Sequence, residues 1–119
     1  MSLFANQLTT GGLLVFTTHG RYFADAFAAN DTLPNFNMSP AARAEMLADY
    51  NNRGFGYQPY ATTPEYGLSI ASPSWVVSML ADCTPELRLV SYTERAWRGR
   101  HDVVTCQKGY TRRVPADAA

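Results

Sequence analysis

The fold is decided by Thr10-Gly11-Gly12-Leu13-Leu14-Val15-Phe16-Thr17-Thr18-His19-Gly20, a short continuous run of apolar β-formers with glycine at both ends. Strands that are buried on both faces have this composition, and they belong to parallel sheets covered by helices. We therefore predict a buried strand over residues 13–18. Residues 3–9 are expected to form the last turns of a helix that leads into this strand.

Three helices are expected after this strand. Phe23 and Phe27 lie four positions apart and give residues 22–29 one apolar edge. The pairs Ser39-Pro40 and Ser72-Pro73 each combine a capping serine with a proline in the first helical turn. These two signals predict helices that run to about residue 51 and to residue 83.

Extended segments account for most of the remaining chain. Residues 55–60 and 66–70 fit a small hairpin, although Pro59 limits its pairing. Residues 87–92 and 102–107 predict two strands, and because only about ten residues without a helix connect them, they should pair antiparallel. The predicted fold class is α/β, with a small mixed sheet that ends in an antiparallel strand pair, about three helices and a small hairpin.

Length and composition narrow the class of protein. The chain has 119 residues, enough for one compact domain. Apolar residues make up 46% and charged residues 17%, which excludes general disorder. Ten basic residues balance ten acidic ones, so no net charge attracts the protein to nucleic acid or membranes. Residues 30–37 are expected to form a loop and residues 110–119 a flexible tail.

The sequence predicts no membrane span and no export signal. Its longest apolar run is four residues, Leu13 to Phe16, whereas a membrane span needs about 20. The N-terminal Met-Ser-Leu-Phe has no basic region followed by an apolar stretch, so we expect a cytoplasmic, reducing compartment. Cys83 and Cys106 are therefore expected to be buried or half-buried free thiols. Neither histidine lies near a cysteine in a zinc-like pattern, so no metal site is predicted.

Several stretches of the chain occur in the same order in one enzyme family. They are the quoted residues 10–20, Tyr66-Gly67-Leu68-Ser69-Ile70-Ala71-Ser72-Pro73-Ser74-Trp75-Val76, Leu87-Arg88-Leu89-Val90-Ser91-Tyr92-Thr93-Glu94-Arg95-Ala96-Trp97 and His101-Asp102-Val103-Val104. The first resembles the fifth-strand region of class I S-adenosylmethionine-dependent methyltransferases, and the second resembles a stretch of one bacterial subgroup. The last two are similar to that subgroup's final strands and their connection. The resemblance covers about residues 4–108 and implies a partial Rossmann-like methyltransferase fold.

The chain departs from the family in two motifs and lacks a third. Thr10 stands where proline is usual, and Arg100-His101-Asp102 stands where the subgroup has His-Gln-Asp, so no role is carried over to His101. The cofactor half of the fold begins with a glycine-rich turn. Gly54-Phe55-Gly56 is the only G-x-G, no third glycine follows it, and the acidic residue for the ribose hydroxyls is missing too.

These observations imply the C-terminal, substrate-side half of a methyltransferase domain. The complete domain would use S-adenosylmethionine as its cofactor, whereas no cofactor is expected for this chain alone. Its methyl acceptor would be a small molecule or a sugar-like compound, and the N-terminal half could be on another chain. We therefore expect the isolated chain to be inactive.

His19, Arg21 and Tyr22 are candidate site residues because they directly follow the predicted strand. Ligands of open α/β sheets lie outside the carboxyl ends of the strands. His19 is the candidate catalytic residue, as a substrate ligand or general base, and the alternative is a loop histidine that orders the turn. Arg21 and Tyr22 are candidate substrate-binding residues for an anionic or sugar-like compound. The alternative is a solvated arginine beside a packed tyrosine.

Tyr57, Tyr60, Tyr66 and Trp75 form a second candidate group. Aromatic side chains in a hairpin beside a helix start can wall a substrate pocket, and Tyr66 and Trp75 are the candidate substrate-binding residues here. The alternative, which we favour at this stage, is that these side chains form a miniature core of the hairpin itself.

Two other classes of function stay open. One is a non-catalytic binding or assembly module that retains part of the fold. The other is a nucleic-acid binder, because residues 88–113 contain seven basic side chains against Glu94 and Asp102. A solvated surface is the more ordinary explanation of this charge, since no recognition motif accompanies it.

The open side of the predicted strand also favours self-association. In the parent fold, one edge of this strand pairs with the final strand and the other with a strand of the N-terminal half. No segment of this chain is expected to cover the second edge. Unpaired backbone groups beside apolar side chains favour pairing with another copy. We therefore expect a homodimer or larger assembly with its interface in residues 3–29.

Overall fold

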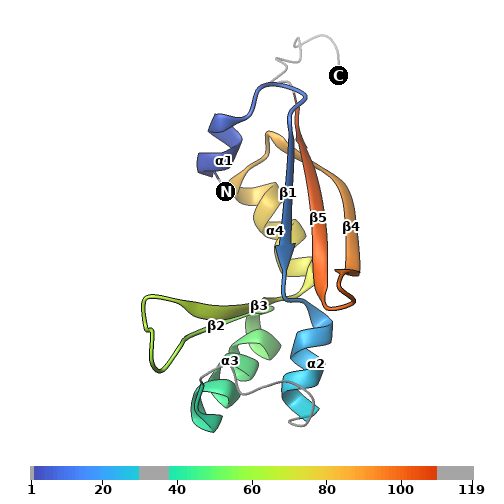
Figure 1. Ribbon diagram of the computed structural model, residues 1–119. Coiled ribbons are helices and arrows are strands. Elements are labelled where there is room, and N and C mark those ends of the chain that lie inside the picture. Colours follow the sequence, from blue (N-terminus) through green and yellow to red (C-terminus); the bar gives the residue numbers. More distant parts are fainter. Residues whose placement is uncertain (1, 30–37, 110–119) are drawn as a thin grey trace.

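The computed structural model describes residues 2–29 and 38–109 and shows a mixed α/β architecture (Figure 1). The loop predicted at residues 30–37 and the tail predicted at residues 110–119 lie outside the described residues. Along the chain, the described elements are α1 (Ser2–Gln7), β1 (Leu13–Thr18), α2 (Arg21–Ala29), α3 (Pro40–Arg53), β2 (Phe55–Pro59), β3 (Gly67–Ala71), α4 (Pro73–Cys83), β4 (Leu87–Trp97) and β5 (His101–Lys108).

A three-stranded sheet forms one end of the molecule, with the strand order β1-β5-β4 (Figure 1). β1 pairs antiparallel with β5, from Leu13 opposite Gln107 to Thr18 opposite Asp102. β4 also pairs antiparallel with β5, so β1 and β4 run in the same direction on either side of it. The predicted pairings of the final strand are confirmed. The expectation of a mixed sheet is wrong, because every neighbouring pair of described strands is antiparallel.

The prediction that β1 is buried on both faces is wrong. Leu13 and Val15 are each 58% exposed, whereas Leu14 and Phe16 pack against the core. The reason is that α1 and α4 lie on one side of the sheet and leave the other side of β1 uncovered by described residues (Figure 1). A continuous apolar run has the same composition whether helices cover both faces of a strand or only one.

The second end of the molecule is built from the β2–β3 hairpin with α2 and α3 (Figure 1). Phe23 and Phe27 of α2, Met46 of α3 and Ile70 of β3 form its buried core. Gly56 is required at the contact between β2 and α3, because a Cβ atom there would collide with the backbone carbonyl of Met46. The predicted hairpin and the helix over residues 22–29 are confirmed.

The two Ser-Pro signals begin helices as predicted. The Ser39 hydroxyl accepts a hydrogen bond from the Ala42 amide at 3.1 Å, and the Ser72 hydroxyl accepts one from the Trp75 amide at 3.2 Å. At the end of α3, Gly54 adopts the left-handed conformation with φ 82° and donates its amide to the Tyr50 carbonyl. Glycine is favoured in this conformation because it has no Cβ atom.

The two cysteines differ in their exposure to solvent. Cys83 and Cys106 are free, and Cys106 is buried as expected, whereas Cys83 at the end of α4 is exposed.

None of the described helices is long and apolar enough to cross a membrane.

The outer edge of β1 predicts self-association. No described strand pairs with this edge, and Val15 is 58% exposed beside it. Light scattering should therefore report at least twice the 13.2 kDa chain mass. Val15→Lys should give a monomer with nearly unchanged thermal stability, because the new charge lies in solvent in the monomer, whereas a lysine on an edge strand disfavours pairing with another copy.

The matched control for Val15→Lys is Val90→Lys. Val90 is 57% exposed and lies on β4, at the opposite edge of the sheet. Dissociation by Val15→Lys alone assigns the interface to β1. A wild-type chain that stays monomeric at high concentration would contradict the edge argument.

Candidate functional site

His19 lies at the junction between the three-stranded sheet and the hairpin. Its backbone carbonyl accepts the amide of Ala71 at 2.9 Å, which joins the exit of β1 to the end of β3. Its Nδ1 atom lies 3.1 Å from the Ser69 carbonyl oxygen. Because a carbonyl only accepts, Nδ1 carries the proton and donates it. The Nε2 atom of the neutral ring is then unprotonated, and it has no hydrogen-bond partner among the described residues.

His19 is one of the residues that line a cavity of about 440 Å³. The described residues that line it come from both halves of the molecule: Thr17, Thr18, His19, Phe55, Ser69, Ala71, Trp75 and His101. The structure thus brings together two predicted site residues, His19 and Trp75, which are far apart in the sequence. It adds His101, whose ring centroid lies 4.8 Å from that of His19.

The two imidazoles sit in an aromatic surrounding. The Phe23 ring lies 4.3 Å from His19 and 5.4 Å from His101, and the Trp97 ring lies 5.0 Å from His101, measured between centroids. Burial lowers the pKa of His19, the neighbouring His101 lowers it further, and the hydrogen bond to Ser69 opposes this shift. The neutral form of His19, with its proton on Nδ1, is therefore favoured at neutral pH.

Asp102 fixes the turn that carries His19. Its side chain is 1% exposed and accepts the Tyr92 hydroxyl and the Arg95 amide, each at 3.0 Å. Arg95 has a φ of 55° in an irregularity of β4 between Thr93 and Trp97. A Cβ atom at Gly20 would overlap the Asp102 carboxylate, so only glycine fits where the chain leaves His19.

The Tyr92 hydroxyl is held in this polar cluster. Burial raises the pKa of Tyr92 to about 12, and its hydrogen bond to Asp102 contributes in the same direction. Tyr92 therefore keeps its proton and donates it to Asp102 across the physiological pH range.

Arg21 lies in a different hollow from His19. Its guanidinium makes a bidentate pair with the Glu94 carboxylate, with 2.6 Å between Nε and Oε1. The hollow of about 360 Å³ beside this pair is also lined by Ser72, Ser74 and Tyr92. The hydrogen bonds with Glu94 raise the pKa of Arg21 and lower that of Glu94. The fork that was expected to bind an anionic substrate is therefore engaged by a carboxylate of the same chain.

Tyr22 and Tyr66 also lie away from the histidine cavity. The Arg95 guanidinium lies 4.4 Å from the centroid of the Tyr22 ring, in a cation–π arrangement. Tyr66 is 70% exposed at the tip side of the hairpin. Tyr57 is exposed as well, whereas Tyr60 packs against the core under the hairpin, so the miniature hairpin core that the sequence favoured forms only in part. Trp75 instead stacks on Phe55, with 4.5 Å between ring centroids and a 20° angle.

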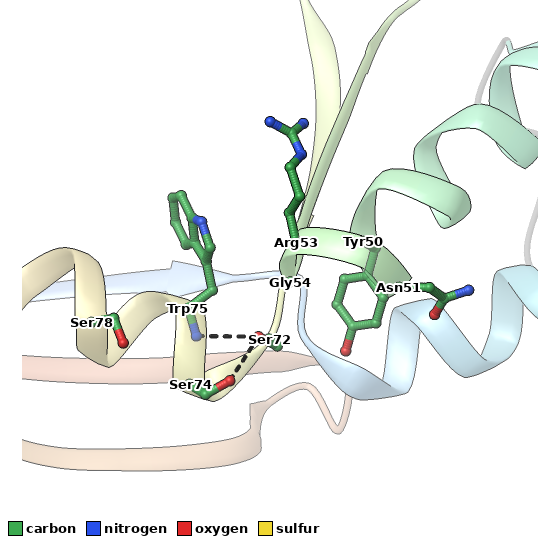
Figure 2. A pocket seen from close by; sticks show the side chains of 8 residues that line it. All are labelled: Tyr50, Asn51, Arg53, Gly54, Ser72, Ser74, Trp75 and Ser78. Atoms are coloured by element: carbon green, nitrogen blue, oxygen red, sulfur yellow. Dashed lines mark hydrogen bonds between the residues drawn. The ribbon is translucent and has the colours of Figure 1, made fainter.

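A second, more polar hollow of about 540 Å³ lies between the end of α3 and the start of α4. Figure 2 shows three serines on the α4 side and Tyr50, Asn51 and Arg53 on the α3 side. The Ser72 hydroxyl, which caps α4, also lies 3.2 Å from that of Ser74. Trp75 lines both this hollow and the histidine cavity, so the two lie on either side of this residue.

His101 is the site residue that sequence analysis left without a role. The predicted pairing of the final strand with β1 was the signal that could have placed His101 at the site. Antiparallel pairing places the start of the final strand beside the end of β1, where Asp102 lies opposite Thr18. A histidine just before Asp102 is thereby brought next to a histidine just after Thr18.

Neither comparison with known proteins nor metal chemistry identifies this site. No protein family, curated protein or solved structure matches the chain. Within residues 2–29 and 38–109, no group of three or more His, Cys, Asp or Glu side chains could hold a metal ion. The function must therefore be argued from the cavity and the sheet.

The contact between Gly20 and Asp102 predicts a strong steric effect. Gly20→Ala should lower the free energy of unfolding by roughly 2–3 kcal/mol, because the packed carboxylate cannot move away from the new methyl group. Urea denaturation measures this change. In the control Gly11→Ala, no atom lies within 4 Å of the new Cβ, but φ is 84°. That variant should lose only about 1–2 kcal/mol, from backbone strain alone. Equal or larger loss in the control would refute the steric argument.

The lowered pKa of His19 predicts a pH dependence of stability. The unfolded chain takes up the His19 proton near the ordinary pKa of 6.5, whereas the folded chain takes it up at a lower pH. The free energy of unfolding should thus fall as the pH drops below 6.5 and level off below the folded pKa. His19→Asn keeps an amide donor for the Ser69 carbonyl and removes the titrating ring. Melting curves between pH 7.5 and 5 should therefore be flatter for His19→Asn, and identical slopes would contradict the assignment.

Proposed function

We propose that this chain is the C-terminal, substrate-side part of a class I S-adenosylmethionine-dependent methyltransferase domain. The observation that carries the proposal is the strand order β1-β5-β4. The strand that resembles the family's fifth strand pairs along one edge with the chain's final strand, as in the parent fold. Its other edge, where the parent fold has a strand of the N-terminal half, pairs with no described strand.

The residues present do not fit the cofactor. Gly54 ends α3 and Gly56 packs on the Met46 carbonyl, so the single G-x-G is a helix-to-strand junction and not a ligand-facing turn. Backbone approach to a nucleotide-like ligand needs such a turn beside a helix N-terminus. S-adenosylmethionine would therefore be bound by a segment other than the described residues.

The contribution of this chain would be the acceptor site. His19 lies at the carboxyl end of β1 and lines a cavity whose other walls come from the hairpin, α4 and β5. Its Nε2 atom can accept the proton of an acceptor hydroxyl, while Ser69 holds the Nδ1 proton in place. Burial of the ring favours the unprotonated form that this role requires.

A second candidate function is a non-catalytic assembly module. It is favoured by the exposed Leu13 and Val15 on a strand edge without a described partner. Nucleic-acid binding has less support. Arg95 and Arg98 lie over the rings of Tyr22 and Trp97, and Arg21 is paired with Glu94, so these cations are engaged within the chain.

Titration calorimetry with S-adenosylmethionine tests the proposal. The 119-residue chain alone should show no binding, because it lacks the glycine-rich turn. The same chain should bind at micromolar concentrations after addition of a cofactor half. That half would be encoded upstream of Met1 or by another methyltransferase gene of the source genome.

The two outcomes that contradict the proposal are distinct. Micromolar binding to the isolated chain would show that the described residues do form a cofactor site. A chain that pairs with no cofactor half, but that assembles with itself through β1, would favour the assembly module.

A further inference from the structure

We propose that the cavity between His19, His101 and Trp75 binds a neutral sugar ring through a matched pair of imidazole nitrogens, one accepting and one donating a hydrogen bond. The inference deepens the proposed function, because such a sugar would be the methyl acceptor. The site lies within this chain, however, so its occupancy is independent of S-adenosylmethionine.

The nitrogen that accepts a hydrogen bond is Nε2 of His19. The Ser69 carbonyl fixes the proton of His19 on Nδ1, and the lowered pKa keeps the ring neutral. Nε2 is then a lone-pair acceptor. It is not among the buried atoms that lack a partner, and His19 is one of the residues that line the cavity, so we assign this nitrogen as the acceptor for a ligand there.

The nitrogen that donates a hydrogen bond is Nε2 of His101. Nδ1 of His101 is buried and has no hydrogen-bond partner among the described residues. A buried N–H without a partner is costly, so the favoured tautomer leaves this nitrogen unprotonated and carries its proton on Nε2. Nε2 of His101 is not among the buried unpaired atoms, and His101 lines the cavity, so we assign this nitrogen as the donor for a ligand there.

The residues that line the cavity favour a ligand without charge. No Lys, Arg, Asp or Glu side chain is among the described residues that line the cavity. Arg21, which the sequence suggested as an anion ligand, is engaged by Glu94 and lines a different hollow. An anionic or cationic ligand would find no counter-charge here, and burying an unpaired charge is strongly unfavourable.

The volume and the lining of the cavity suit a sugar ring. The cavity volume of about 440 Å³ is within the usual range for small-molecule sites, roughly 300–1,000 Å³. The lining combines the stacked rings of Trp75 and Phe55 with two residues that carry hydroxyl groups, Thr17 and Ser69. The ring of Trp75 is already stacked on Phe55, so it offers a single face. A pyranose has one apolar C–H face and several hydroxyls, each of which can donate to His19 and accept from His101.

Nuclear magnetic resonance titration of the wild-type chain tests the site without cofactor. The probes are the methyl glycosides of glucose, galactose, mannose and N-acetylglucosamine, with phenol and benzoate as the uncharged aromatic and anionic alternatives. At least one glycoside should shift the imidazole resonances of both histidines with millimolar affinity. Phenol and benzoate should shift them at least tenfold more weakly.

Side-chain variants separate the two nitrogens. His19→Asn keeps a donor for the Ser69 carbonyl but places no acceptor at the position of Nε2, and His101→Phe keeps the ring packing but removes the donor. Each should weaken glycoside binding about tenfold, which corresponds to one lost hydrogen bond of about 1.4 kcal/mol. His101→Gln supplies an amide N–H near the position of Nε2 and should stay within about threefold of the wild type. Ser78→Ala, in the neighbouring hollow, is the matched control and should change nothing.

Several outcomes would overturn the proposal. They are the absence of any glycoside-induced shift, tighter binding of phenol or benzoate, and wild-type glycoside affinity in either His19→Asn or His101→Phe. If His101→Phe does not fold, the comparison of His19→Asn with His101→Gln decides. A failure here leaves the calorimetric test of the methyltransferase proposal unaffected, because no cofactor is present in these titrations.

Discussion

The buried carboxylate of Asp102 connects the parts of the structure on which the candidate site depends. It comes from β5, accepts hydrogen bonds from Tyr92 and Arg95 of β4, and touches Gly20 at the exit of β1. A buried carboxylate is costly unless its oxygens are hydrogen-bonded. Any arrangement that separates these segments would remove its partners. The carboxylate therefore selects one position for the turn that carries His19 and one shape for the end of β4.

The second constraint is that the molecule has two apolar cores and one connecting seam. Val76, Leu80 and Val104 belong to the core under the three-stranded sheet, and Phe27 and Met46 belong to the core under the hairpin. The seam between them is polar backbone: Ala71 donates to the His19 carbonyl, and Ser72 donates to the Gly54 carbonyl. The histidine cavity lies at this seam, and three of the residues that line it, Ala71, Phe55 and Trp75, belong to or pack against the core under the three-stranded sheet.

The sequence predicted which residues form helices and strands better than it predicted which side of each element is buried. The Ser-Pro caps and the glycine stops act within one helical turn, so α3, α4 and the hairpin were predictable from local chemistry. The exposed side of β1 was not, because Leu13 and Val15 have the same identity whether or not a helix covers them. The separation of Arg21 from His19 could not be predicted either, since it depends on Glu94, which lies 73 positions away.

Similar reasoning explains which site residues were predictable. Position after a buried strand singled out His19, and aromatic character singled out Trp75, whereas their common cavity required the docking of the hairpin onto the sheet. Tyr66 has the same aromatic character, but it lies on the exposed part of the hairpin. Composition identifies side chains that can bind a ring, and only the tertiary arrangement decides which of them face an enclosed space.

The hydrogen bond from His19 to the Ser69 carbonyl has a consequence for the chemistry of the imidazole. The partner that holds the proton on Nδ1 belongs to the hairpin, not to the strand that carries the histidine. Were the hairpin to move away from the sheet, Nδ1 would lose its acceptor, and the proton could move to Nε2. The ring would then present a donor to the cavity in place of an acceptor. The docked position of β3 thus acts as a tautomer selector, and the basicity of this site is a property of the joined halves of the molecule.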